Sequence, residues 1–223
     1  MDSFSIDGSY TDVLVNIITK KDILHVGCVG TWSVDNKKNF SAHKMICTYA
    51  NSVEGIDIDE KGIAMMNSEG FTCLVASAES YKTEKKYDVV LIPSVLQFVS
   101  DPLAAVSHLA TYLKPDGLMC IDVPHVYGFS NILRHAQKFD AIKKIQLNGQ
   151  SEIGEVSLFH AASLANIIIQ SGLTHLYSRT YIIKKMSKNV SYKENLRIFL
   201  NNVPWYLNKK FGPSLLCIAQ KKK

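Results

Sequence analysis

The chain has 223 residues, 47% hydrophobic and 20% charged, with a net charge of +5. One domain is the simplest organisation for this length, large enough to bury about 70% of the surface of the unfolded chain. No apolar run approaches the ~20 residues that span a bilayer. The five cysteines include no C-x-x-C pair. We therefore expect no structural disulfide, no metal site and a reducing, cytoplasmic compartment. We also expect no signal peptide, because the first residues lack its basic start and apolar core.

The elements are expected in alternation, with helices at 9–20, 39–50, 60–68, 102–113, 161–171 and 192–202 and strands at 23–27, 53–58, 72–76, 87–92, 118–123, 174–184 and 214–220. Strands separated by helices predict an α/β fold with a Rossmann-like, doubly wound, mainly parallel sheet, helices on both faces and an antiparallel edge strand. We expect one domain over 1–223. It would include an N-terminal helix in 1–22, a substrate lid at 124–158 and a helical insertion at 187–213 before the last strand.

Charge is distributed unevenly along the chain. Residues 1–111 carry 9 Lys and Arg against 14 Asp and Glu, a net −5, whereas residues 112–223 carry 16 against 6, a net +10. The basic residues form either solvated loops and a floppy tail, or a rim that attracts a phosphorylated substrate or an anionic membrane surface. Nucleic acid is not an expected partner, because the basic clusters lack interleaved aromatic residues and no binding motif is present.

A glycine turn follows the first apolar strand, and an acid ends the second. The turn is Gly27-Cys28-Val29-Gly30, and the second strand ends in Gly55-Ile56-Asp57. Glycines let the backbone approach a ligand closely, and a carboxylate at this place accepts hydrogen bonds from ribose hydroxyls. The pattern predicts a site for an adenosine-containing cofactor. A nicotinamide-dependent oxidoreductase fits less well, because Asp57 lies 30 positions beyond Gly27 rather than about 20.

Residues 20–185 resemble a class I S-adenosylmethionine-dependent methyltransferase. The resemblance is carried by the two motifs above together with Ala76-Ser77-Ala78-Glu79 after the third strand and Leu113-Lys114-Pro115-Asp116-Gly117 before the fifth. The GCVG-type loop with a preceding histidine is similar to a small-molecule or glycan branch, often found in cell-surface glycan and lipid biosynthesis. The resemblance implies S-adenosyl-L-methionine as cofactor and S-adenosyl-L-homocysteine as product.

It also implies roles for individual residues. The expected cofactor-binding residues are Gly27, Cys28, Gly30, Asp57, Ile58, Ser77, Ala78, Glu79 and Pro93. Asp57 would bind the ribose, Ile58 would pack on the adenine ring, and Ser77 to Glu79 would meet the adenine edge. The chain departs from the family pattern at His25, where an acid is usual, at Ser77, where an aspartate is usual, and at Gln97, where a histidine is usual.

Methyl transfer depends mainly on alignment of donor and acceptor, and a base adds about 10²–10⁴-fold when the acceptor is a hydroxyl. The candidate bases are His125, Glu155 and His160. Each histidine could equally be a satisfied polar group near a loop, and His43 is expected to be structural.

The leading interpretation is methyl transfer to a small-molecule, sugar or lipid-linked acceptor, with or without a phosphate group, and O-methylation is slightly favoured over other methylation. The alternative is a non-catalytic, methyltransferase-like module that binds cofactor or a partner. It is motivated by the altered glycine loop and by His25 and Gln97. The oligomeric state is left open.

Overall fold

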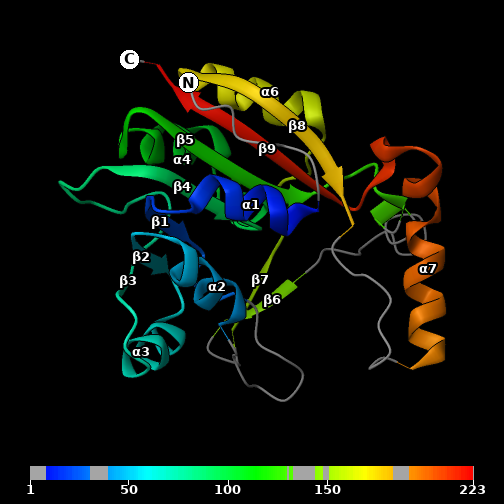
Figure 1. The fold of residues 1–223 in the computed structure, drawn as a ribbon, viewed down its shortest axis with the longest axis horizontal. Helices are drawn as coiled ribbons and strands as arrows, with labels where there is room; N and C mark the ends of the chain where they lie inside the picture. Colours follow the sequence, from blue (N-terminus) through cyan, green and yellow to red (C-terminus); the bar gives the residue numbers. More distant parts are fainter. Residues whose placement is uncertain are drawn as a thin grey trace.

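The computed structural model describes residues 9–30, 40–129, 131–132, 144–147, 151–182 and 191–222. Within them a seven-stranded sheet runs in the order β3-β2-β1-β4-β5-β9-β8, and a separate hairpin pairs β6 with β7 (Figure 1). The strands are β1 (Asp22–Val26), β2 (Ser52–Asp57), β3 (Cys73–Val75), β4 (Tyr87–Pro93), β5 (Leu113–Pro124), β6 (Lys144–Leu147), β7 (Ser151–Gly154), β8 (Leu173–Tyr181) and β9 (Ser214–Lys221). The helices are α1 (Tyr10–Ile18), α2 (Ser41–Tyr49), α3 (Glu60–Ser68), α4 (Pro102–Ala110), α6 (Ala161–Gln170), α7 (Tyr192–Leu207) and the short η1 (Leu96–Phe98) and η2 (Lys209–Phe211).

The sheet is parallel from β3 to β5. The antiparallel pairing lies at the β8 edge, where β9 runs antiparallel to both β5 and β8. Parallel neighbours need long crossover connections, and the helices supply them. The predicted α/β class, with a mainly parallel sheet and antiparallel pairing at one edge, is confirmed.

Alternate side chains of each central strand face opposite layers of helices, as the period of two in a strand requires. In β4, Val89 and Leu91 pack with apolar residues of α1 and α2, whereas Val90 and Ile92 pack with those of α4 and α6. Because these strands are buried on both faces of the sheet, their sequences are continuous apolar runs rather than alternating ones. Helices on both faces, also predicted, are therefore present.

The helices begin where the sequence provides caps. The Ser9 side chain accepts a hydrogen bond from the amide of Asp12, whose carboxylate accepts from Ser9 N in return, and this capping box starts α1. Asp59 caps α3, and Asp101 caps α4, where proline occupies the first turn. At the end of α6, Gly172 has φ +81°, the left-handed conformation expected of a glycine past a helix end.

Residues 114–117, expected as a turn before the fifth strand, lie inside β5. Tyr87 pairs with Leu113 and Val89 already pairs with Leu118, so the four residues between are an irregularity in the β5 ladder. The Lys114 ammonium anchors this segment by bonding the carboxylates of Asp22 at 2.8 Å and Asp88 at 3.1 Å. The fifth strand therefore starts earlier than the turn signal indicated.

The expected lid and insertion are described in part. From the lid, 130, 133–143 and 148–150 lie outside the described residues, and so do 183–190 ahead of α7 and the first eight residues of the chain. In the described part, β7 is followed by a segment that bonds to η1: Val156 N donates to Gln97 O at 2.7 Å. Among the helices described, none combines the length and the apolar character needed to cross a membrane.

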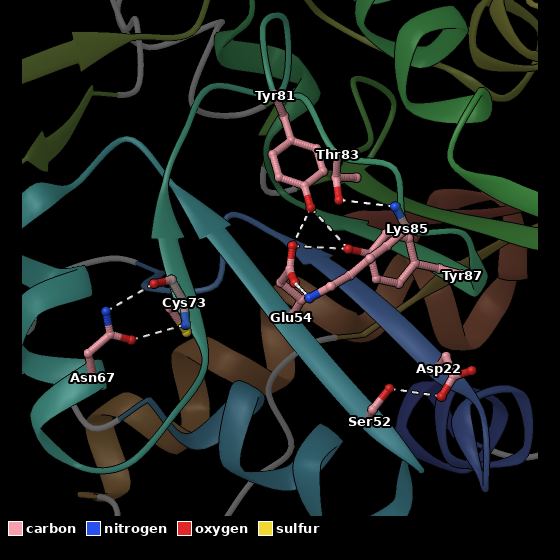
Figure 2. Close-up of polar contacts among 9 residues, drawn as sticks. All are labelled: Asp22, Ser52, Glu54, Asn67, Cys73, Tyr81, Thr83, Lys85 and Tyr87. Carbon is pink, nitrogen blue, oxygen red and sulfur yellow. Dashed lines mark hydrogen bonds and ion pairs between the residues drawn. The ribbon is translucent and has the colours of Figure 1, made fainter.

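A buried carboxylate links β2 to the segment before β4. Glu54 is 6% exposed and accepts hydrogen bonds from the hydroxyls of Tyr81 and Tyr87 and from the ammonium of Lys85 (Figure 2). Burial acts to raise the pKa of Glu54, but the bonds from Lys85, Tyr81 and Tyr87 outweigh it and hold this pKa below its usual value. The carboxylate is thus stabilised in its charged form.

We expect Glu54→Gln to lower the free energy of unfolding at pH 7 by about 1–3 kcal/mol, because two buried hydroxyls lose a charged acceptor. A depressed carboxyl pKa contributes stability above the unfolded value of about 4.3, and this contribution is lost as the pH falls through the folded value. Urea denaturation between neutral and acid pH should therefore show a weaker acid dependence in the variant. Glu69→Gln, which removes an exposed ion pair with Lys44, is the control with little expected change. Equal stability of Glu54→Gln and wild type would contradict the account.

Candidate functional site

A cavity of about 500 Å³ lies at the carboxyl ends of β1, β2 and β4. The chain leaves β1 toward β2 on one side and returns after β3 to β4 on the other side (Figure 1). Ligands of open α/β sheets bind at such a switch point, and the volume lies within the ~300–1,000 Å³ typical of small-molecule sites. The position and size of the cavity make it the candidate functional site.

The glycine loop after β1 forms the floor of this cavity. Gly27 has φ +76°, and a Cβ built there would lie 2.4 Å from the Cγ2 atom of Val95. Its amide donates to Ile56 O at 2.8 Å, so the loop folds across the end of β2. Only glycine fits this close, left-handed turn without displacing its neighbour.

The carboxylate of Asp57 holds the loop to the end of β2. Its Oδ2 accepts from Val29 N at 3.0 Å, and its Oδ1 accepts from Asp59 N at 3.0 Å. Asp57 lines the cavity and is half-buried. A carboxylate has about four lone-pair sites, so it can bind the loop and a ligand hydroxyl together.

The rim of the cavity beyond Asp57 combines an apolar side chain with a polar turn. Ile58 is 44% exposed although it lines the cavity, which suits contact with a flat apolar ring. Ser77 accepts through its hydroxyl from Glu79 N at 3.1 Å. The Glu79 carboxylate accepts from the amide and the hydroxyl of Ser100, so it anchors the segment before α4.

All the residues predicted to bind the cofactor line this one cavity: Gly27, Cys28, Gly30, Asp57, Ile58, Ser77, Ala78, Glu79 and Pro93. The cavity is also lined by residues that were not predicted from the sequence, among them Phe40, Ser41, Ala42, Val95, Phe98, Val99 and Ile153. Phe40, Ser41 and Ala42 lie at the start of the helix after the glycine loop. Backbone amides at the start of a helix commonly face a ligand, so their place in the sequence could have indicated these three residues.

Two buried polar side chains in the cavity wall have unusual surroundings. Gln97 is 1% exposed, and no described residue gives either atom of its amide group a hydrogen-bond partner. His25 Nδ1 lies 3.0 Å from His43 Nδ1, while its buried Nε2 has no partner among the described residues. Burial, with a smaller effect of His43, lowers the pKa of His25 to about 3, so its ring is neutral.

None of the three candidate bases is among the residues that line the cavity. His125 follows β5, and its ring packs edge-on against Tyr127, which also contacts the ring of His160. His160 caps α6 by accepting from Ser163 N at 3.4 Å. Glu155 is half-buried on the segment after β7. Two of the three thus gather around Tyr127.

The ring of His125 has a defined tautomer. Its Nδ1 lies 3.1 Å from Gly212 O, and because a carbonyl only accepts, Nδ1 carries the proton. Burial lowers the pKa of His125, with the Gly212 bond opposing and the charge of His160 adding to the decrease. At neutral pH the ring is neutral with Nε2 unprotonated, the form that can accept a proton.

A family model described as "Methyltransferase domain" matches residues 16–178. No curated protein sequence matches the chain significantly. The solved structures similar to the chain include a SAM-dependent methyltransferase from Archaeoglobus fulgidus, at 17% identity and TM-score 0.59, over 92% of this chain and 88% of that one.

Two further similar structures carry bound ligands. The N-methyltransferase NodS from Bradyrhizobium japonicum WM9, in complex with S-adenosyl-L-homocysteine, matches at 11% identity and TM-score 0.55, over 92% of this chain and 80% of that one. The 1,6-didemethyltoxoflavin-N1-methyltransferase from Burkholderia thailandensis, with 1,6-didemethyltoxoflavin and S-adenosylhomocysteine, matches at 14% identity and TM-score 0.51, over 92% and 72%. At these identities the likeness concerns the fold.

We expect Asp57→Ala to weaken S-adenosylhomocysteine binding about tenfold or more, since each hydrogen bond to a charged group contributes about 1.5–3 kcal/mol. Glu60→Ala, an exposed acid nearby at the start of α3, is the matched control and should bind as wild type does. Isothermal titration calorimetry gives both affinities. Wild-type affinity in Asp57→Ala, with the fold intact by circular dichroism, would remove Asp57 from the site.

Proposed function

Since the chain belongs to the methyltransferase domain family and is an S-adenosylmethionine-dependent methyltransferase, we propose that it methylates a hydroxyl of a small-molecule, sugar or lipid-precursor acceptor. The cofactor, when bound, supplies an activated methyl group on a sulfonium. The protein then has to hold the cofactor, align the acceptor and remove a proton.

The lining of the cavity fits this cofactor. Asp57 offers carboxylate oxygens for the ribose hydroxyls, and exposed Ile58 offers an apolar surface for the adenine. The backbone at Gly27, which has no side chain to cover it, would lie beneath the methionine part of the cofactor. Ser77 and Ala78 would meet the adenine edge through the Ser77 hydroxyl and the backbone amides.

The single observation that carries the choice of a polar acceptor is the buried amide of Gln97. A buried amide without a partner costs about 1–3 kcal/mol, and no described residue offsets this cost at Gln97. Gln97 lies in the wall of the cavity, next to the end of β4. A ligand that both donates and accepts hydrogen bonds, such as a hydroxylated acceptor, would satisfy it.

His125 is the proposed general base. Its Nδ1 is fixed as a donor to Gly212 O, which leaves Nε2 to take the proton of an acceptor hydroxyl. His160 fits this role less well, because its Nδ1 is used to cap α6. Glu155 remains the second candidate, since it follows the β7 strand whose Ile153 lines the cavity.

The net +10 of residues 112–223 supports an acceptor that carries phosphate, such as a sugar on a nucleotide or lipid phosphate. A long-range field of this sign raises the local concentration of anions, and salt screens it. Transfer to a phosphorylated acceptor should therefore be more sensitive to ionic strength than transfer to its neutral counterpart.

We expect methyl transfer from labelled S-adenosylmethionine to hydroxyl acceptors in a panel of nucleotide sugars and matched amines, with the methylated atom assigned by mass spectrometry. Because the pKa of His125 is lowered, the rate should stay high below the ordinary value of about 6.5 and fall only at more acid pH. In His125→Gln the rate should drop by about 10²–10⁴ and this acid limb should disappear.

His175→Gln, which removes a half-buried histidine of β8 bonded to Ser178, is the control and should keep both rate and profile. Methyl groups found on nitrogen, or a His125→Gln profile equal to wild type, would contradict the proposal.

A further inference from the structure

Two cysteines and a histidine from distant parts of the chain meet at the glycine loop. Cys28 comes from the loop after β1, His43 from α2 and Cys73 from β3, and all three are buried. Their Sγ and ring nitrogen atoms lie within 4.8 Å of one another. We propose that Cys28, His43 and Cys73 bind a zinc ion that holds the glycine loop in place.

The distances suit a tetrahedral ion. Zinc–sulfur bonds of about 2.3 Å and zinc–nitrogen bonds of about 2.0–2.1 Å place neighbouring ligand atoms roughly 3.5–3.8 Å apart. Cys73 Sγ lies 3.8 Å from His43 Nε2. Thiolate and imidazole are the ligands of structural zinc sites. Cys47, one helical turn beyond His43 on α2, is exposed and lies outside this cluster, so the three residues leave the fourth position to a water molecule.

Space for the two sulfur atoms comes from a glycine. A Cβ built on Gly55 in β2 would lie 2.7 Å from Cys28 Sγ and 2.7 Å from Cys73 Sγ. Any other residue at position 55 would displace both thiols. The glycine in the middle of β2 is thus matched to the sulfur pair beside it.

The backbone or ring of each proposed ligand is held in place by another group. The side chain of Asn67 bonds both backbone groups of Cys73, at 2.9 and 3.0 Å (Figure 2). Cys28 N donates to Ile56 O at 3.2 Å. Such fixed ligands lose little conformational freedom when a metal binds, which favours affinity.

His25 provides the outer contact that metal-bound histidines usually have. With His43 Nε2 on the metal, His43 Nδ1 carries the proton and donates to His25 Nδ1 at 3.0 Å. His25 is then protonated on Nε2, its other ring nitrogen, and His25 is part of the cavity lining. The proposed ion therefore fixes the tautomer of a residue that contacts the cofactor cavity.

The first test is the metal content of the purified wild-type protein after dialysis, by inductively coupled plasma mass spectrometry. We expect about one zinc ion per chain. After removal of zinc by a chelator, titration with Co²⁺ should give visible absorption bands of tetrahedral cobalt and a sulfur-to-cobalt charge-transfer band. This wild-type measurement decides the proposal even where a variant fails to fold.

Cys73→Ala and His43→Ala should lower the zinc content about tenfold or more, because each removes a ligand. Cys120→Ala is the matched control, since Cys120 is also 3% exposed in a strand of the same sheet, and it should keep its zinc. Chelation should lower the melting temperature of wild type and leave that of Cys73→Ala unchanged. Wild-type protein with neither zinc nor a cobalt spectrum, or Cys73→Ala with full zinc, would overturn the proposal, as would a Cys28–Cys73 disulfide in place of the metal.

Discussion

The carboxylate of Asp57 makes the interactions on which the shape of the candidate site depends. It sits at the end of β2, accepts the amide of Val29 from the glycine loop, and accepts the amide of Asp59 that starts α3. Three segments of chain thereby converge on one charge at the switch point of the sheet. The loop cannot leave this position without leaving buried amides unpaired, which costs free energy. The same carboxylate then faces the cavity, so the group that shapes the site also belongs to its lining.

The cavity differs in character from one side to the other. Near β2 it combines an exposed apolar side chain, Ile58, with the carboxylate of Asp57. Near β4 it presents the buried amide of Gln97, and His125, which is outside the lining, follows the neighbouring strand β5. An apolar rim beside a carboxylate suits an adenosine, whereas an amide that both donates and accepts suits a polar acceptor. This division supports a cofactor side and an acceptor side within one cavity.

Local sequence signals sufficed for the sheet and for the residues that line the cavity at the ends of β1 and β2. These features depend on residues that are neighbours in the chain: the apolar runs that become β1, β2 and β4, the helix caps such as Ser9 and Asp101, and the glycine turn at Gly27. The burial of Gln97 and the meeting of Cys28 with Cys73 do not, because they arise only when distant segments pack together. Cysteine spacing alone therefore gave no sign of the sulfur pair.

A structure of the protein with S-adenosylhomocysteine bound tests the central claim most directly. The account predicts that the ribose hydroxyls lie within hydrogen-bond distance of the Asp57 carboxylate and that the adenine packs on Ile58. It also predicts that the homocysteine part follows the backbone at Gly27 toward Gln97. A ligand bound outside this cavity, or a ribose turned away from Asp57, would contradict it.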